Sequence, residues 1–144
     1  MARRVTAAVI AVAAIAAILA YLRDPPWLTA VESGLRGWET AADGVRFRWT
    51  DGHASFFVPA SLPEITIPVR ATFDTPGDPP VLVTIAIDDR AADEIVLRDP
   101  QWTTRRLRLP PPGSRSLRRI DIRVDRVRPG NRGVQLGYIE RRPH

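Results

Sequence analysis

Few residues in this chain have side chains suited to nucleophilic, acid–base or metal chemistry. The chain has no cysteine and two histidines, His53 and His144. Thiolate chemistry and disulfides are therefore excluded, and too few histidines are present for a histidine-based metal centre. His53 follows Asp51-Gly52, which predicts a turn, and Ser55 on the same strand face offers poor geometry for a serine–histidine relay. We expect His53 to be a solvated turn residue and, at most, a ligand contact.

Carboxylates are numerous, but the sequence singles out no pair. Any two of Glu39, Glu64, Glu94 and the aspartates could converge as the acid and base of a glycoside hydrolase. Four aspartates lie in predicted loops at a spacing that matches no calcium-binding loop: Asp74, Asp78, Asp88 and Asp89. We expect ordinary turn carboxylates there, and neither a metal nor a cofactor.

Three tryptophans follow the N-terminal segment. Trp49 and Trp102 fall in predicted strands, on registers that favour burial in the core. Trp38 lies in a predicted loop, where an exposed indole would suit the apolar face of a sugar ring. Trp38 and His53 are therefore the candidate ligand-binding residues.

The first element is an uncharged run over residues 5–22, closed by Arg23-Asp24-Pro25-Pro26. As a helix it would be about 27 Å long, close to the roughly 30 Å of a bilayer core, and it has no amphipathic stripe. It predicts a membrane anchor over residues 1–27 that contacts the lipid bilayer through residues 5–22. The alternative is a signal peptide cleaved after Ala20.

Both interpretations export the rest of the chain. Arg3 and Arg4 favour a cytoplasmic N-terminus. We therefore expect a single-pass protein of the inner (cytoplasmic) membrane, with residues 28–144 as a globular domain on the extracytoplasmic side.

From residue 45 onward, apolar and polar residues alternate with a period of two, which predicts half-buried strands. The predicted strands cover residues 45–50, 54–58, 65–73, 81–87, 94–97, 101–109, 117–127 and 134–140. Turn signals recur between them, and no helix pattern follows the anchor. The fold class is therefore all-β: an antiparallel β-sandwich, jelly-roll-like with about eight strands, preceded by one N-terminal transmembrane helix.

Two places in these strands predict irregular pairing. Pro68 lacks an N–H group, which predicts a sheet edge or a bulge. Trp102 and Thr104 occupy even positions whereas Leu107 and Leu109 occupy odd ones, so one regular strand cannot bury both sets. We expect a bulge near residues 105–106.

The basic residues are all arginine, and the chain carries a formal net charge of +5. Acidic residues prevail over residues 28–97 and arginines over residues 98–132. Arg119, Asp121, Arg123 and Asp125 alternate in sign along one face of a predicted strand, so their fields largely cancel. With the aromatic residues directed to the core, nucleic acid is not an expected partner. Attraction to anionic lipid headgroups is the better alternative.

Three short motifs carry a resemblance: Gly37-Trp38-Glu39, Arg48-Trp49-Thr50 and the segment from Asn131 to Gly137. With Trp102 and Leu109-Pro110 between them, their order resembles a small jelly-roll, carbohydrate-binding-like β-sandwich domain of bacterial membrane proteins linked to envelope polysaccharide glycosyltransferases. The match covers roughly residues 37–140, and Glu39 lies closer to Trp38 than in the family pattern. It implies the fold and a cell-envelope setting.

In this setting we interpret Glu39, Arg48 and Arg132 as a structural ion network over a tryptophan-lined end of the core. Replacing Glu39 with Gln would then lower thermal stability without abolishing glycan binding. The expected function is that of a non-catalytic, membrane-anchored binding or scaffolding module, not an enzyme. Its expected partner is an envelope glycan or a membrane glycosyltransferase. The alternative is an envelope glycan hydrolase that uses paired carboxylates.

Overall fold

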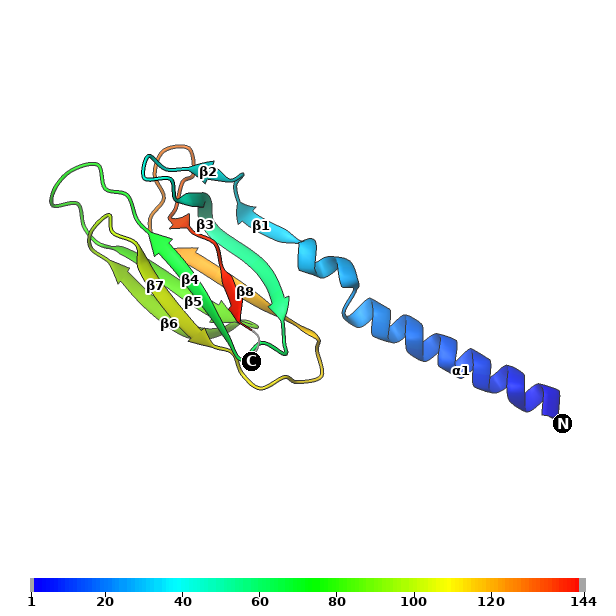
Figure 1. The fold of residues 1–144 in the computed structure, drawn as a ribbon. Coiled ribbons are helices and arrows are strands. Elements are labelled where there is room, and N and C mark those ends of the chain that lie inside the picture. Colours follow the sequence, from blue (N-terminus) through cyan, green and yellow to red (C-terminus); the bar gives the residue numbers. More distant parts are fainter. Residues whose placement is uncertain (1, 143–144) are drawn as a thin grey trace.

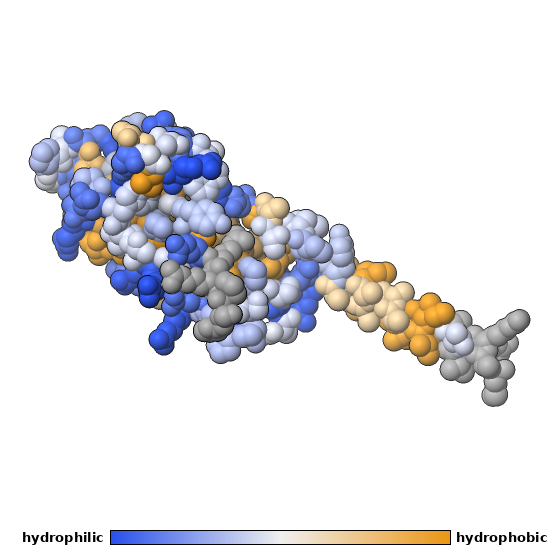
Figure 2. Space-filling model, in the orientation of Figure 1, coloured by the Kyte–Doolittle hydropathy of each residue, from blue (hydrophilic) through white to orange (hydrophobic). Residues whose placement is uncertain are grey.

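The structure is a computed structural model that describes residues 2–142. It begins with helix α1 (Ala2–Arg23), which projects away from the strands, followed by the short 3₁₀ helix η1 (Pro26–Ala30) (Figure 1). The stretch Ala8–Ala30 is a candidate membrane span with a mean hydropathy of 1.7, and residues 8–23 of it are exposed. Figure 2 shows its apolar side chains exposed along the shaft of the helix. By length and composition α1 is suited to cross a membrane, a property that signal sequences share.

The rest of the described chain is an antiparallel β-structure, as predicted. Its ten strands are β1 (Glu32–Leu35), β2 (Glu39–Thr40), β3 (Arg46–Pro59), β4 (Glu64–Arg70), β5 (Val81–Ile87), β6 (Arg90–Leu97), β7 (Thr103–Arg108), β8 (Leu117–Val124), β9 (Gln135–Leu136) and β10 (Glu140–Arg142). They pair in the order β10-β4-β9-β3-β8-β5-β6, while β7 pairs with β4, and β1 and β2 pair with β3. The sheet folds into a nearly closed sandwich, as Figure 1 indicates.

The core lies between the two layers and follows the predicted alternation. On β4, Ile65, Ile67 and Val69 are at most 1% exposed, and Ile85 on β5 and Ile120 on β8 are fully buried. The intervening residues of these strands face outward, and most of them are polar. Period-two patterning therefore decides which face of each strand enters the core.

The strand β3 connects the two layers. Its first half pairs with β9 at Arg48↔Leu136, and its second half pairs with β8 from His53↔Arg123 onward. The hairpin turn predicted at Asp51-Gly52 is wrong, because β3 is one strand of 14 residues that runs through this dipeptide. Ladder pairing on both sides overrides the local turn signal.

A bend in β3 replaces the predicted turn, and Gly34 of β1 packs against it. Along β1 the partner shifts from Ser55 to Thr50 within two residues. Gly34 has φ +63°, and a Cβ placed there would lie 1.9 Å from the carbonyl oxygen of His53. Only glycine fits this position.

Of the two irregular pairings expected from the sequence, one is absent and one is present. The predicted bulge near residues 105–106 is wrong: β7 pairs with β4 in unbroken register, and Trp102 lies before the strand begins. Pro68 lies within β4, opposite the break between β9 and β10. The register shifts there by one residue, from Val69↔Leu136 to Thr66↔Glu140, so the irregular pairing predicted at Pro68 is confirmed. The predicted last strand over 134–140 is divided at this break. Residues 28–44, for which no strand was predicted, contribute β1 and β2.

Candidate functional site

A surface groove of about 310 Å³ lies between β1 and the link from β9 to β10. Both segments flank β3, which supplies the base of the groove. Its lining includes two charged side chains and two exposed aromatic rings, together with apolar residues of the core end: Glu32, Trp38, Arg48, Phe56, Leu136 and Tyr138. The groove therefore combines apolar surface with a small number of placed polar groups, which is typical of ligand sites.

An ion pair crosses the base of the groove. Arg48 on β3 donates from Nη1 to Glu32 Oε2 at 2.7 Å, and its Nη2 lies 2.6 Å from Glu32 Oε1. This two-pronged geometry fixes both groups, as is usual for arginine and a carboxylate. The side chain of Arg48 is 15% exposed and that of Glu32 is 36% exposed. The carboxylate is thus the partner that solvent can reach.

The indole of Trp38 forms one wall and rests on arginine side chains. The guanidinium carbons of Arg46 and Arg48 lie 5.4 Å and 5.1 Å from the ring centroid. Both arginines leave the same face of β3, so they support the ring from the strand side. Trp38 is 42% exposed, and Tyr138 on the other segment is 73% exposed. The prediction of an exposed Trp38 is therefore confirmed.

The three residues of the expected ion network do not meet. Arg48 pairs with Glu32 on β1 instead of Glu39. Arg132 lies 5.6 Å from the ring centroid of Trp49, a cation–π contact. The side chain of Glu39 on β2 is exposed and makes no ion pair within residues 2–142. The strand β1, which had no sequence signal, supplies the carboxylate that takes its place.

His53 lies outside the groove, on the outer face of β3, and it is a strand residue instead of the predicted turn residue. Its side chain is 52% exposed, and its Nε2 lies 2.9 Å from Asp121 Oδ1 on β8. Arg119 donates to the other oxygen of Asp121 at 2.8 Å. Burial alone would raise the pKa of Asp121, but hydrogen bonds from His53 and Arg119 outweigh it and lower this pKa.

The buried aromatics form a second cluster, separate from the groove. Trp49 is buried as predicted, and its ring meets that of Phe47 edge-on at 5.9 Å. Trp102 is half-buried, so its predicted place in the core is wrong. Its ring stacks on the guanidinium of Arg70 at 4.5 Å and approaches Gly137. A cation–π contact with arginine therefore covers the ring of Trp102, which lies outside the core.

The loop aspartates mostly act as turn residues. Asp78 accepts hydrogen bonds from Thr75 and from the backbone of Asp74, which closes their loop. Asp88 and Asp89 form the two-residue turn between β5 and β6, with φ of 50° and 66°. Among the described residues, no group of three His, Asp or Glu side chains is placed to hold a metal ion.

Two residues of the groove were missed by sequence reasoning. Tyr138 fell within a predicted strand, where alternation gave no reason to single it out. Glu32 lies in a segment without a strand signal. The one local cue was Gly137, since a glycine before an aromatic residue can mark an interruption of a strand.

Comparison with known proteins supports the fold and does not identify a family. No family model matches the chain, and no curated protein matches it. A family two carbohydrate esterase from Clostridium thermocellum, solved in complex with cellohexaose, is similar with a TM-score of 0.50 and 7% identity, over 78% of this chain and 31% of the esterase. The chain thus spans about a third of that protein.

Two further solved structures are similar at lower scores. The salicylyl-acyltransferase SsfX3 from a tetracycline biosynthetic pathway has a TM-score of 0.48 and 12% identity, over 76% of this chain and 35% of that one. The CBM51-2 and INT domains of ZmpB from Clostridium perfringens have a TM-score of 0.41 and 11% identity, over 76% of this chain and 28% of that one. The fold shared with the esterase agrees with the expected carbohydrate-binding-like β-sandwich, and at this identity it establishes the fold alone.

Proposed function

We propose that this protein is a membrane-anchored, non-catalytic β-sandwich module that binds a glycan of the cell envelope in the groove between Trp38 and Tyr138. One observation carries the proposal: two exposed aromatic rings flank a groove whose base holds the Glu32–Arg48 ion pair. The fold shared with part of a carbohydrate esterase supports it.

The groove has the chemistry that a sugar ring needs. The apolar face of a pyranose can stack on an indole or a phenol ring, and its hydroxyl groups can donate to Glu32 and accept from Arg48. Arg46 and Arg48 already hold the indole of Trp38 in place. Little conformational entropy is then lost when the ligand binds.

The lining of the groove supports binding in preference to hydrolysis. A glycoside hydrolase generally needs two carboxyl groups about 5 to 10 Å apart beside the scissile bond. The lining of the groove includes one carboxylate, Glu32, and Arg48 holds it in an ion pair. The alternative function, an envelope glycan hydrolase, gains no specific support from this arrangement.

The anchor would place the module at the inner membrane. In this proposal α1 (Ala2–Arg23) remains attached and the strands lie on the extracytoplasmic side. A glycan polymer at the membrane surface, or a membrane glycosyltransferase that handles one, would then be within reach of the groove.

A glycan array and a pull-down with envelope polysaccharide test the proposal with the full-length protein in detergent. Affinity for the best ligand is then measured for W38A and Y138A, with Y138F as the matched control that keeps the ring. We expect each alanine variant to weaken binding at least about tenfold, the equivalent of roughly 1.4 kcal/mol, and Y138F to bind within about twofold of wild type.

Three outcomes would contradict the proposal. They are binding that is unchanged in both alanine variants, no retention of any glycan, and release of reducing sugar from the polysaccharide. The last outcome would favour the hydrolase instead.

A further inference from the structure

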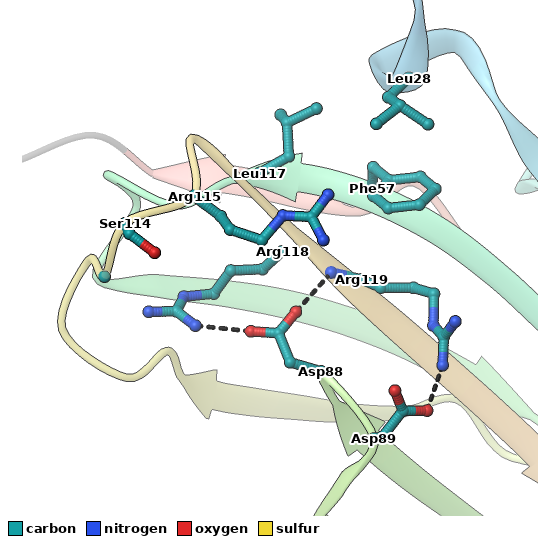
Figure 3. Close-up of a pocket in the computed structure, with 10 residues that line it drawn as sticks. Leu28, Phe57, Asp88, Asp89, Ser114, Arg115, Leu117, Arg118 and Arg119 are labelled. Carbon is teal, nitrogen blue, oxygen red and sulfur yellow. Dashed lines mark hydrogen bonds and ion pairs between the residues drawn. The ribbon is translucent and has the colours of Figure 1, made fainter. Parts of the chain in front are cut away.

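A second cavity, of about 430 Å³, is lined in part by the loop that is bonded to the end of α1. It is formed between η1, the second half of β3, the turn between β5 and β6, and the loop that precedes β8 (Figure 3). Leu28 and Phe57 give it an apolar side, and Asp88, Asp89 and Arg115 are among its charged residues. It shares no lining residue with the groove at Trp38.

Arg115 ties this cavity to the end of α1. It donates from Nη2 to the backbone oxygen of Arg23 at 3.1 Å and from Nε to Asp24 at 3.0 Å. The backbone N–H of Ser116 donates to Asp24 at 2.8 Å. The loop that lines the cavity is therefore bonded to the last turn of the helix and to the residue after it.

These bonds fix the depth of the cavity relative to a bilayer. The helix has 22 residues and hence a length of about 33 Å, enough to cross a hydrocarbon core of about 30 Å. If α1 spans the bilayer, Arg23 lies at the interface, and a cavity bonded to Arg23 opens among the lipid headgroups. Trp27 follows the helix and is 57% exposed, as is typical of interfacial aromatics.

The charges of the cavity are mixed and nearly balanced. Figure 3 shows Arg118 and Arg119 on either side of Asp88: Arg118 Nη1 donates to it at 2.6 Å, and the backbone N–H of Arg119 donates at 2.9 Å. The guanidinium of Arg119 also pairs with Asp89. A purely anionic ligand would have to approach these carboxylates.

Of the charged residues of the lining, Arg115 and Asp89 have the most exposed side chains, and both keep hydrogen-bonding capacity. Within the part of the chain that the structure describes, Arg115 Nη1 donates to no acceptor, and Asp89 Oδ2 accepts from no donor. The side chain of Asp89 is 77% exposed and that of Arg115 is 55% exposed. The cavity thus offers an exposed donor of positive charge and an exposed acceptor of negative charge beside an apolar wall. Arg118 Nε also has no acceptor among the described residues, but it is buried.

We propose that this cavity is a headgroup site for an aminophospholipid, a lipid that carries both a phosphate and a primary ammonium group. The phosphate accepts from Arg115, the ammonium donates to Asp89, and the start of an acyl chain lies against Leu28 and Phe57. A quaternary ammonium has no N–H to donate, and an anionic headgroup without an amine leaves Asp89 Oδ2 without a donor. The inference rests on the anchoring part of the proposed function and is independent of glycan binding.

Native mass spectrometry of the full-length protein in detergent tests the site. The probes are phosphatidylethanolamine, phosphatidylcholine and phosphatidylglycerol with identical acyl chains, added in equal amounts. We expect phosphatidylethanolamine to be retained at least about fivefold more than the other two. D89N should reduce it to the level of phosphatidylcholine, and R115Q should lower the retention of all three.

The control variant is R106Q, which replaces an exposed arginine of β7 that makes no ion pair within residues 2–142. It should retain lipids as wild type does, and thermal melting checks that all three variants are folded. Equal retention of the three lipids by wild type, or an unchanged preference in D89N, overturns the proposal. Extraction of the protein from membranes by alkaline carbonate separates the two ideas, because release into the soluble fraction overturns the anchoring as well.

Discussion

Two regions of the molecule hold an arginine–carboxylate pair, one between β3 and β1 and the other within β8, and burial falls on opposite partners in the two pairs. In the groove, Arg48 is 15% exposed and its partner Glu32 is 36% exposed. On the outer face of β8, Asp121 is 5% exposed and its partner Arg119 is 39% exposed. The buried partner is the cation in one region and the anion in the other.

The difference in burial indicates which carboxylate a ligand can reach. Asp121 accepts from both His53 and Arg119, so its oxygens are occupied and burial makes their loss costly. Glu32 faces solvent beside two exposed aromatic rings. The presence of an arginine–carboxylate pair is therefore no guide to function. The exposure of the carboxylate and the presence of exposed aromatic rings beside it indicate which pair can contact a ligand.

The largest effect on stability is expected from G34A, which should displace β1 and with it the Glu32–Arg48 pair of the groove. The new Cβ would meet the carbonyl oxygen of His53 at 1.9 Å, at a backbone φ of +63°, so β1 cannot keep its pairing with β3. Glu32 would lose its position, and we expect a loss of at least about 3 kcal/mol in the free energy of unfolding. Urea unfolding followed by circular dichroism measures it.

The matched control is G37A, in the loop before Trp38. A Cβ at Gly37 would meet nothing within 4 Å. Its free energy of unfolding should stay within about 0.5 kcal/mol of wild type. If G34A proves as stable as G37A, β1 is not held as the structure has it.

A smaller effect is expected from D121N, which acts on the β8 face alone. Two hydrogen bonds to a buried carboxylate are weakened, at a cost of about 2 kcal/mol in stability at neutral pH. Glycan affinity at the groove should not change, because Asp121 is not among the residues that line the groove. Thermal melting and binding measured on the same sample separate the two readouts.

The pH dependence of the same variant gives a second check. Burial would raise the pKa of Asp121, but its hydrogen bonds lower it below the unfolded value near 3.9. Its contribution to stability is therefore complete above the unfolded pKa and is lost as pH falls through the lower folded pKa. Between pH 5 and 2, wild type should lose more stability than D121N, and parallel curves would contradict this role.

The next effect concerns the support of Trp38 by Arg48. A double-mutant cycle of R48Q and W38A, measured as the free energy of unfolding, should give a coupling energy of about 0.5 to 1 kcal/mol. The reason is that the guanidinium of Arg48 lies 5.1 Å from the ring centroid of Trp38. The control cycle pairs W38A with R106Q, a residue of β7 outside the groove, and should give none. Equal coupling in both cycles would mean that the ring is not held by Arg48.

Local alternation was sufficient to predict the sandwich, since it determines which face of each strand is apolar. It failed where the outcome depends on distant pairing. Asp51-Gly52 predicts a turn by itself, but β9 and β8 hold both flanks of this dipeptide in one strand. The bulge was predicted because Trp102 and Leu107 cannot lie on the same face of one regular strand. No bulge is needed, because Trp102 lies before β7 begins.

The candidate site was predictable in part. Trp38 was correctly expected to be exposed, because it lies in a predicted loop and not on the buried face of a predicted strand. Its partners could not be predicted: Glu32 is positioned by the pairing of β1 with β3, and Tyr138 by the break between β9 and β10. Both depend on contacts between segments far apart in the sequence, which a single sequence does not specify.

The smallest effect is expected from E39Q, and it decides between two accounts of the same region. The motifs around Trp38 predict that Glu39 belongs to an ion network, in which case its loss lowers the melting temperature. In the structure Arg48 is held by Glu32, and the side chain of Glu39 is exposed without an ion pair among residues 2–142. We therefore expect a change within about 0.5 kcal/mol for E39Q and a larger loss for E32Q. Since Arg48 also supports Trp38, E32Q should weaken glycan binding, whereas the reverse ranking would restore Glu39 as the partner.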